Sequence, residues 1–595
     1  MKTRIQIHRV LVVSALALLA LAPPTARAAS GSWTQATSGG NWSDTANWSG
    51  GIVADASGST AAFNTLDLTA NNIVHLDGSR TLTGLTFGDT DTSTAFSWIL
   101  DDNASSGGNI LTLAGTTPTI TVGAMGTGSS ATISAVIGGT TGWSKAGAGT
   151  LVLSGANTTS GALTLTGGTL ALSGGDNRLL NTSTLTFSGN NTILDLGGTS
   201  QKMSGMTFAN TANQTYTVQG NGTLTLDGAS NFILGAPVGN PGTVGKVANL
   251  AGVSTFIYNA SNNKFGVGTQ NSGNLTGSSN ESDTLTLATT ANTITATTFA
   301  VVDLDTGVAL TNTATVHLGQ SNTINATTFN VGSVGRATAT LDFATGLASN
   351  PSLKIRGTAG GSSRADIVIA STAGNRANPS PTAKIDLTTG VTGTSALDAM
   401  VGTLMIGRST RTSTSSQDAT GSFIMGGGTL DATTIVLGQD TAGGSSGTQT
   451  GTLSLSGGTV KVATLTIGNK NGGNTVIGNL NLNSGTLRAT TVQKGAGAAT
   501  RNLNWSAGSI QNYDASTDLS IGTGLTVSLV GSSDDHTFNI DANRTANVAA
   551  VIANGASSVG KLVKSGDGTL ALTAANTYTG TTTASGGALL VNSPG

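Results

Sequence analysis

Short stretches in which apolar and polar residues alternate recur along most of the chain. Gly, Asn or Ser bounds each stretch. Representative stretches are Leu66-Asp67-Leu68, Leu111-Thr112-Leu113, Leu151-Val152-Leu153, Leu163-Thr164-Leu165, Leu224-Thr225-Leu226 and Leu285-Thr286-Leu287. Alternation with a period of two, rich in Thr, Val, Ile and Leu, is typical of half-buried β-strands. Beyond about residue 30 no stretch keeps the 3.6-residue apolar period of a helix for three turns. The sequence therefore predicts an all-β protein.

Longer segments repeat as well. Residues 143–172 align without a gap with residues 562–591, and residues 292–299 recur as residues 322–329. A third series of similar strands begins at Gly428, Gly458 and Gly485. Spacings of about 27–30 residues lie in the range of solenoid coils.

A solenoid accounts for the repeats and the composition together. One short strand buries too little apolar surface alone, but successive coils can stack their strands in parallel at about 4.8 Å. Identical charges one coil apart would repel each other, which explains a charged content of only 9%. The sequence therefore predicts a parallel β-helix. A string of antiparallel β-sandwiches is the alternative, although such cores normally need more aromatic residues than the 4% present.

The charge balance argues against a nucleic-acid partner, and the lack of cysteine excludes disulfide bonds. The chain has 26 basic and 28 acidic residues, a net charge of −2, so no nucleic-acid partner is expected. No cysteine is present, so the chain contains no disulfide.

The N-terminus has the pattern of an export signal. A basic start with Lys2, Arg4 and Arg9 precedes an apolar run, and Ala26-Arg27-Ala28 provides a small-x-small cleavage pattern. The apolar run is too short to span a bilayer core of about 30 Å. We therefore expect residues 1–29 to be a cleaved signal peptide, and the mature chain to be exported without a transmembrane segment.

The two aligned blocks resemble the autotransporter-associated β-strand repeat. They share Lys-x-Gly-x-Gly-Thr-Leu, a Leu-rich strand, Ala-Asn-Thr-Tyr-x-Gly and a Gly-Gly-x-Leu strand, with Thr159 in place of the tyrosine in the first copy. Gly40-Asn41-Trp42-Ser43 is similar to the start of such proteins. The resemblance implies a right-handed parallel β-helix passenger that is exported and displayed at the cell surface or released. Such passengers often precede an outer-membrane barrel; no barrel or sorting tail is present before Gly595, so we expect either a fragment or another export route.

Half of the six tryptophans lie close together near the start of the mature chain, as Trp33, Trp42 and Trp48. We interpret them as part of an N-terminal hydrophobic cap of the solenoid. A platform for stacking on carbohydrate is the alternative.

Two glycine-rich segments match the residue pattern of a catalytic or phosphate-binding motif but lack other features that the motif needs. Gly443-Gly444-Ser445-Ser446-Gly447 matches a nucleophile elbow, but no helix follows. The chain has four histidines that such a site could use, His8, His75, His317 and His536. The segment 555–561 matches a phosphate-binding loop but has Leu562 where Ser or Thr is needed. We expect a repeat turn at the second motif and no catalysis at the first.

Several aspartates could hold Ca²⁺ in principle. They are Asp89 and Asp91, Asp101 and Asp102, Asp303 and Asp305, and Asp534 and Asp535 beside His536. None fits a known calcium loop, so we interpret them as turn-forming residues. We therefore expect no catalytic residue, no cofactor and no metal site.

These observations predict an exported, non-catalytic β-helical passenger that acts as a structural or adhesive rod at the bacterial cell surface or outside the cell. A polysaccharide-active β-helix lyase or glycosidase is the alternative, since two carboxylates on adjacent coils would have suitable spacing. The expected partner is a polysaccharide or a surface glycoprotein. The expected divisions are a signal peptide at 1–29, a cap with the first coils at 30–110, β-helix with the first repeat at 111–200, β-helix middle at 201–390, β-helix with 27–30-residue repeats at 391–530, and a truncated second repeat at 531–595.

Overall fold

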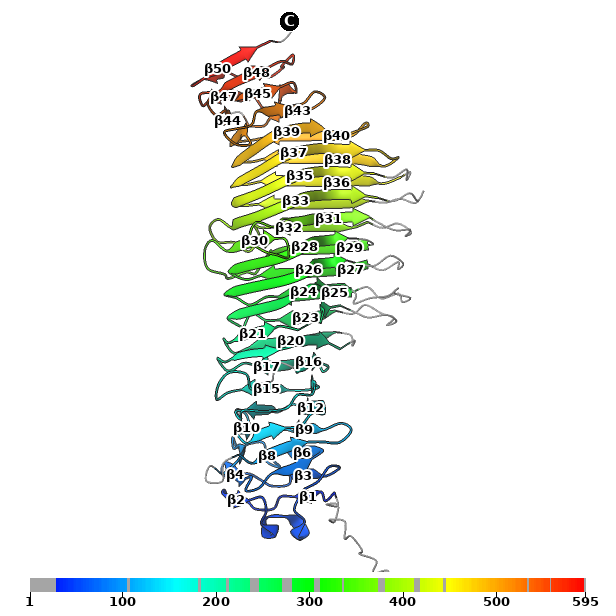
Figure 1. Ribbon diagram of the computed structural model, residues 1–595, viewed down its shortest axis with the longest axis vertical. Coiled ribbons are helices and arrows are strands. Elements are labelled where there is room, and N and C mark those ends of the chain that lie inside the picture. The colour runs from blue at the N-terminus through cyan, green and yellow to red at the C-terminus, as the bar shows by residue number, and fades with distance from the viewer. Residues whose placement is uncertain are drawn as a thin grey trace, which may run out of the picture.

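The computed structural model describes residues 28–592, except 104–107, 180–182, 210–212, 229, 236–244, 270–280, 304–310, 334–335, 373–379, 411–417, 442–445, 532–533 and 557. The predicted signal peptide lies almost wholly outside the described residues and stays a prediction. The described chain winds into coils stacked along one long axis, from the N-terminal coils at one end to the C-terminal coils at the other (Figure 1).

Four sheets of parallel strands form the walls of this rod. The eight-stranded sheet near the N-terminus contains β1 (Gly31–Ser32), β3 (Thr60–Phe63), β6 (Gly84–Phe87), β9 (Thr119–Val122), β12 (Trp143–Ala146), β14 (Leu163–Leu165), β16 (Thr184–Phe187) and β19 (Gly205–Phe208). A three-stranded sheet contains β5 (Arg80–Leu82), β8 (Ile110–Leu113) and β11 (Val136–Gly138). Two single-turn 3-10 helices, η1 (Thr45–Asn47) and η2 (Ser49–Gly51), precede the regular coils.

The full-length sheet runs in series from β2 to β46 along the rod. Its strands are β2 (Gly40–Asn41), β4 (Asn72–His75), β7 (Trp98–Asp101), β10 (Ser130–Ile133), β13 (Thr150–Leu153), β15 (Thr169–Leu172), β17 (Thr192–Asp195), β20 (Gln214–Gln219), β23 (Lys246–Asn249), β25 (Glu281–Thr286), β27 (Thr311–Leu318), β29 (Arg336–Phe343), β32 (Thr382–Asp386), β34 (Ala419–Met425), β36 (Thr448–Leu455), β38 (Thr475–Leu482), β40 (Thr500–Trp505), β43 (Thr526–Leu529) and β46 (Val551–Asn554).

The twenty-stranded sheet begins at β18 and continues to the last coil. Its strands are β18 (Ser200–Met203), β21 (Thr223–Leu226), β22 (Phe232–Leu234), β24 (Thr255–Val267), β26 (Ala291–Asp303), β28 (Ser321–Ser333), β30 (Ser352–Arg356), β31 (Ala365–Thr372), β33 (Ala396–Ser409), β35 (Gly428–Asp440), β37 (Thr459–Lys470), β39 (Thr486–Lys494), β41 (Ser509–Asn512), β42 (Leu519–Ile521), β44 (Asp535–Asn539), β45 (Thr545–Val548), β47 (Lys561–Ser565), β48 (Thr569–Leu572), β49 (Thr582–Ala584) and β50 (Ala588–Val591).

The alternation in the sequence places one face of each strand in the core. In β13 and β15 the buried Leu151 and Leu153 stack in register on Leu170 and Leu172, while Thr150 pairs with the equally outward Thr169. The strands within these sheets pair in parallel, and the described bridges outside them, Ala29 with Asp55 and Trp33 with Trp48, are antiparallel. The parallel β-helix is thus confirmed, and its right-handed winding stays a prediction.

The internal repeats correspond to neighbouring coils. Residues 292–296 of β26 pair with residues 322–326 of β28, and Phe299 pairs with Phe329. In the third series Leu430 pairs with Val460, which in turn pairs with Leu487. Sequence repeats therefore mark side chains that lie directly above one another in the rod.

The middle coils contain long strands that bend and so form two sides of the coil. The alternation of buried and exposed residues in β28 breaks at Thr327, and the residues on either side pair with two separate strands, β30 and β31. Both of these strands then pair with the single strand β33. A corner of the coil can therefore be either a bend within one strand or a loop between two.

The three N-terminal tryptophans lie inside the rod. Trp33, Trp42 and Trp48 are at most 2% exposed and pack against one another and against Phe63. The alternative of a sugar-stacking platform is wrong, because buried rings cannot contact a ligand. Their role as a cap stays a prediction. In the part of the chain that the structure describes, no helix is long and apolar enough to span a membrane.

Candidate functional site

The lysine of each aligned block points into the rod and binds backbone carbonyl groups. Lys145 on β12 is fully buried, and its Nζ donates to the carbonyl oxygens of Gly147, Gly149 and Gly167 at 2.7, 2.5 and 2.8 Å. Gly167 belongs to the next coil, since β12 pairs with β14 and Gly167 follows β14. One ammonium group therefore joins the turns of two successive coils.

The second block repeats this arrangement near the C-terminal end. Lys564 on β47 is also fully buried, and its Nζ donates to the carbonyl oxygens of Ser565, Gly566 and Gly586 at 2.8, 2.8 and 3.1 Å. Burial lowers the pKa of Lys145 to about 8 and also lowers the pKa of Lys564, because the rod interior disfavours a charged amine. The carbonyl oxygens partly compensate by accepting hydrogen bonds from the protonated form.

The asparagine of each block links coils through its side-chain amide. Asn157 is buried; its Oδ1 accepts from the backbone N–H of Ile137 at 3.0 Å and its Nδ2 donates to the carbonyl of Arg178 at 3.1 Å. In the second block Asn576 accepts from the N–H of Ile552 at 2.9 Å. These asparagines therefore satisfy backbone groups of the coils beside them.

The glycine that follows the asparagine leaves no space for a side chain. A Cβ atom on Gly161 would lie 2.3 Å from the carbonyl oxygen of Thr141, and one on Gly580 would lie 2.0 Å from that of Gly560. Both distances are far shorter than a van der Waals contact. In both blocks the lysine, the asparagine and this glycine therefore hold adjacent coils together. We call this arrangement the coil-to-coil clamp.

Comparison with known proteins agrees with this geometry. Residues 144–172 and 562–591 match the model of the passenger-associated-transport-repeat family. Over 65 residues the chain is 52% identical to the Adhesin BmaC autotransporter of Brucella suis biovar 1 (strain 1330), a match that covers 11% of this chain and 2% of that protein. Short parts of the chain are therefore similar to autotransporter passenger repeats. No solved structure matches it.

The chain also carries two histidine–aspartate pairs on neighbouring strands of the full-length sheet. His317 on β27 lies in register with Asp342 on β29, and Nδ1 of the imidazole is 2.6 Å from the Asp342 carboxylate. His75 on β4 makes the same pair with Asp101 on β7, also at 2.6 Å. Both histidines and Asp101 were candidates from the sequence, but their pairing and the role of Asp342 were not predicted.

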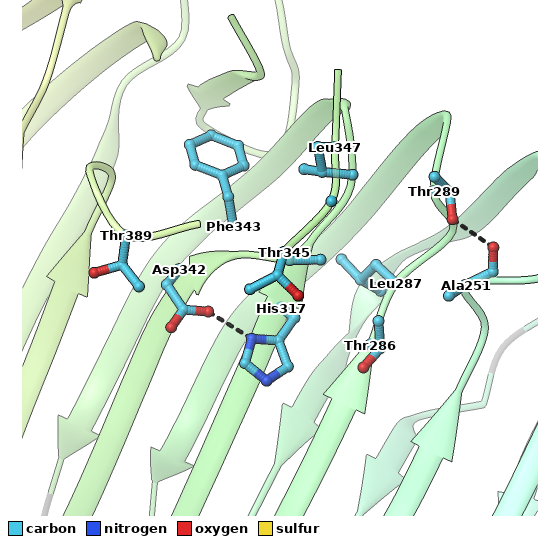
Figure 2. Close-up of a pocket in the computed structure, with 12 residues that line it drawn as sticks. Ala251, Thr286, Leu287, Thr289, His317, Asp342, Phe343, Thr345, Leu347 and Thr389 are labelled. Atoms are coloured by element: carbon cyan, nitrogen blue, oxygen red, sulfur yellow. Dashed lines mark hydrogen bonds and ion pairs between the residues drawn. The ribbon is translucent and has the colours of Figure 1, made fainter. Parts of the chain in front are cut away.

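A recess of about 360 Å³ opens beside the His317–Asp342 pair, at the edge where β25, β27 and β29 end. Figure 2 shows the His317 ring hydrogen-bonded to Asp342, with Thr286 and Thr389 on either side of the pair. The lining residues are Ala251, Thr286, Leu287, Thr289, His317, Asp342, Phe343, Ala344, Thr345, Gly346, Leu347 and Thr389. The surface combines hydroxyl groups, one imidazole and one carboxylate with apolar side chains.

Several of the aspartates considered as calcium ligands take other roles. Asp89 accepts from the backbone N–H groups of Leu68 and Asp91, both at 3.1 Å. Hydrogen bonds from Ser93 lower the pKa of Asp91. Asp303 forms an ion pair with Lys264 at 3.0 Å. Asp305 lies outside the described residues.

His536 is buried and binds the backbone. Its Nδ1 is 2.9 Å from the carbonyl oxygen of Lys561, and its Nε2 is 2.8 Å from that of Trp505. Both nitrogens are thus occupied and unavailable to a metal ion. No group of three His, Cys, Asp or Glu side chains that could hold a metal comes together among the described residues.

The two glycine-rich motifs have different outcomes. Residues 443–445 of the first motif lie outside the described residues. The second motif is followed by a strand, β47, which begins at Lys561. A strand therefore stands where a phosphate-binding loop needs a helix, and the repeat turn stays a prediction.

β25 carries a buried acidic group, Asp283, that was not predicted from the sequence. Asp283 accepts a hydrogen bond from the backbone N–H of Lys246 at 3.0 Å. Burial raises the pKa of Asp283 well above its usual range, and the nearby Glu281 raises it further. The low-dielectric interior therefore favours the protonated carboxyl.

Proposed function

We propose that the chain is exported and acts outside the cell as a non-catalytic adhesive rod. The observation that carries this proposal is the polar face, which we define as the outward side of β25, β27, β29, β32, β34, β36, β38 and β40. One row of it consists of side chains in register on successive strands: Thr284, Thr315, Thr340, Lys384, Ser422, Thr452, Asn479 and Asn502. Similar polar groups repeated coil after coil suit multivalent contact with a partner that is itself repetitive.

Hydrogen bonds between coils order part of this face. Nδ2 of Asn479 donates to Thr452 at 3.1 Å, and Nδ2 of Asn502 donates to Asn479 at 2.7 Å. Asn504 donates to Asn481 in the same way at 2.9 Å. The side chains are therefore held in place before a partner arrives, which reduces the entropy lost on binding.

The recess beside His317 gives the enzyme alternative no support. A polysaccharide lyase or glycosidase needs two carboxylates about 5–10 Å apart, or a held cation with a basic catalyst. Among the described residues that line the recess, Asp342 is the only carboxylate, and Lys and Arg are lacking. Asp386 lies in register with Asp342 on the next strand, but its carboxylate accepts hydrogen bonds from Thr388 and Thr389 and pairs with Lys384. We therefore keep the adhesive rod as the single proposed function.

Attachment of coated beads tests the proposal. Beads that carry many copies of the full chain should attach to cells or to glycoprotein-coated surfaces about a hundredfold more strongly than a single copy binds, because the contacts add through avidity. Beads coated with heat-unfolded chain are the control and should detach. Equal binding by single copies and beads, or release of cut or unsaturated sugar products from added polysaccharide, would contradict a non-catalytic adhesive role.

A further inference from the structure

The recess beside His317 has the composition of a site for an uncharged, hydroxyl-rich ligand. Thr286, Thr289, Thr345 and Thr389 surround it with hydroxyl groups. Those of Thr289 and Thr389 donate to the Ala251 carbonyl and to Asp386, so toward a ligand they act as acceptors. Nδ1 of His317 is hydrogen-bonded to Asp342, so the ring turns Nε2 away from the carboxylate (Figure 2). A neutral imidazole in this position donates through Nδ1 and accepts through Nε2, which suits a ligand hydroxyl.

Apolar side chains form another part of the lining. Leu287 and Phe343 are 1% exposed and close the inner side, while Leu347 is half-buried at the wall. A sugar ring has hydroxyl groups at its edge and C–H groups on its faces, so it matches a surface that alternates between these two kinds of group. Cavities of about 300–1,000 Å³ are the usual size for small ligands, and the recess lies within this range.

The charged residues of the lining indicate which class of sugar the recess can bind. Lys and Arg are missing from the described lining, so a sulfate, phosphate or uronate group would find no cation. The Asp342 carboxylate is already paired with His317, which leaves it poorly suited to a metal ion. We infer that the recess binds a neutral sugar unit of a glycan chain. This inference rests on the proposed adhesive function and adds a site and a ligand class to it.

The other histidine–aspartate pair provides a matched control. His75 and Asp101 have the same in-register placement and the same 2.6 Å separation as the pair in the recess, and the two histidine side chains are 24% and 33% exposed. His75 does not line the recess. If the pair merely ties adjacent strands together, substitution of either histidine should have the same effect.

The experiment measures binding of the full chain to an array of neutral and acidic glycans. The wild-type chain should bind at least one neutral glycan, His317→Ala should weaken that binding at least tenfold, and His75→Ala should leave it unchanged. Leu347→Glu, which places a charge at the wall and keeps the His317–Asp342 pair, should also weaken it. Thermal unfolding of each variant shows whether the rod is intact.

Three results of the glycan array would overturn the inference. They are equal effects of His317→Ala and His75→Ala, binding of the wild type to acidic glycans only, and retention of binding in Leu347→Glu. Attachment of beads to cells without binding to any neutral glycan would overturn the recess assignment and leave the adhesive rod in place. Failure of the beads to attach, together with binding to a neutral glycan that depends on His317, would overturn the adhesive role alone.

Discussion

Replacing Lys145 with methionine is expected to lower the free energy of unfolding of the first repeat by about 3 kcal/mol. Methionine fills much of the same space but leaves the carbonyl groups of Gly147, Gly149 and Gly167 without the ammonium that they share. When buried acceptors lose a charged donor, no hydrogen bond offsets the free energy that it costs to remove them from water. Urea unfolding, with residues 143–172 followed by hydrogen exchange, measures the change.

The pH dependence of the same variant separates the buried amine from a general packing defect. Below pH 8 the amine is protonated in both the folded and the unfolded chain. Because burial lowers the pKa of Lys145 from 10.5 to about 8, the folded chain loses this proton first as the pH rises. The unfolded chain then binds more protons, so stability rises with pH between about 8 and 10.5. The difference in unfolding free energy between wild type and variant should therefore grow from pH 7 to pH 10.

Lys202→Met is the control for this experiment. Lys202 forms an ion pair with Asp227 at 2.7 Å, but its side chain is 43% exposed. Exposed pairs contribute less than about 1 kcal/mol, so this variant should unfold nearly as the wild type does. A loss of stability in Lys145→Met no larger than that in Lys202→Met would contradict the coil-to-coil clamp. A difference that is flat with pH would contradict the lowered pKa of Lys145.

Replacing Phe265 with alanine is expected to destabilise the middle coils by about 3–5 kcal/mol. Phe265 is fully buried, and its ring centroid lies 4.4 Å from that of Phe232 and 5.6 Å from that of Phe299. Phe299 continues the stack to Phe329 at 4.6 Å. Alanine would leave a cavity between coils that backbone pairing on both sides prevents from closing.

Hydrogen exchange along the rod measures the loss of stability in Phe265→Ala. Protection should fall by about 100- to 3,000-fold in β24 and β26, because each 1.4 kcal/mol corresponds to a tenfold change in the opening equilibrium. The loss should diminish with distance from Phe265, since each coil contacts only its neighbours. Phe265→Leu, which keeps most of the volume, should cost much less. A uniform loss over the whole rod, or an equal loss in the leucine variant, would contradict this local account.

The strands and the stacking were predictable because both depend on local pattern. Alternation fixes which side chains of a strand point inward, and repeats of equal length show which residues align. Phe299 and Phe329 could therefore be matched from the sequence, and the structure pairs them. The buried lysine could also be recognised as a repeat position, although its three carbonyl partners could not, because they lie on turns whose path depends on the next coil.

The recess could not be predicted because it depends on coils of unequal length. His317 and Asp342 are 25 residues apart, whereas Asp342 and its next in-register partner, Asp386, are 44 apart. No single repeat length brings these residues together. The loops that carry Thr345, Leu347 and Thr389 have no counterpart in the repeated segments, so only the folded chain shows that they meet.

The register between β26 and β28 has an evolutionary consequence. Their sequences share Asn-Thr-Ile-x-Ala-Thr-Thr-Phe, and the buried Asn292 of one strand contacts Asn322 of the next at 2.9 Å. An in-frame duplication or loss of the thirty residues between these two positions, by unequal recombination, would set near-identical side chains against the same neighbours. The molecule can thus change its reach by one coil in a single genetic event, without a compensating change elsewhere.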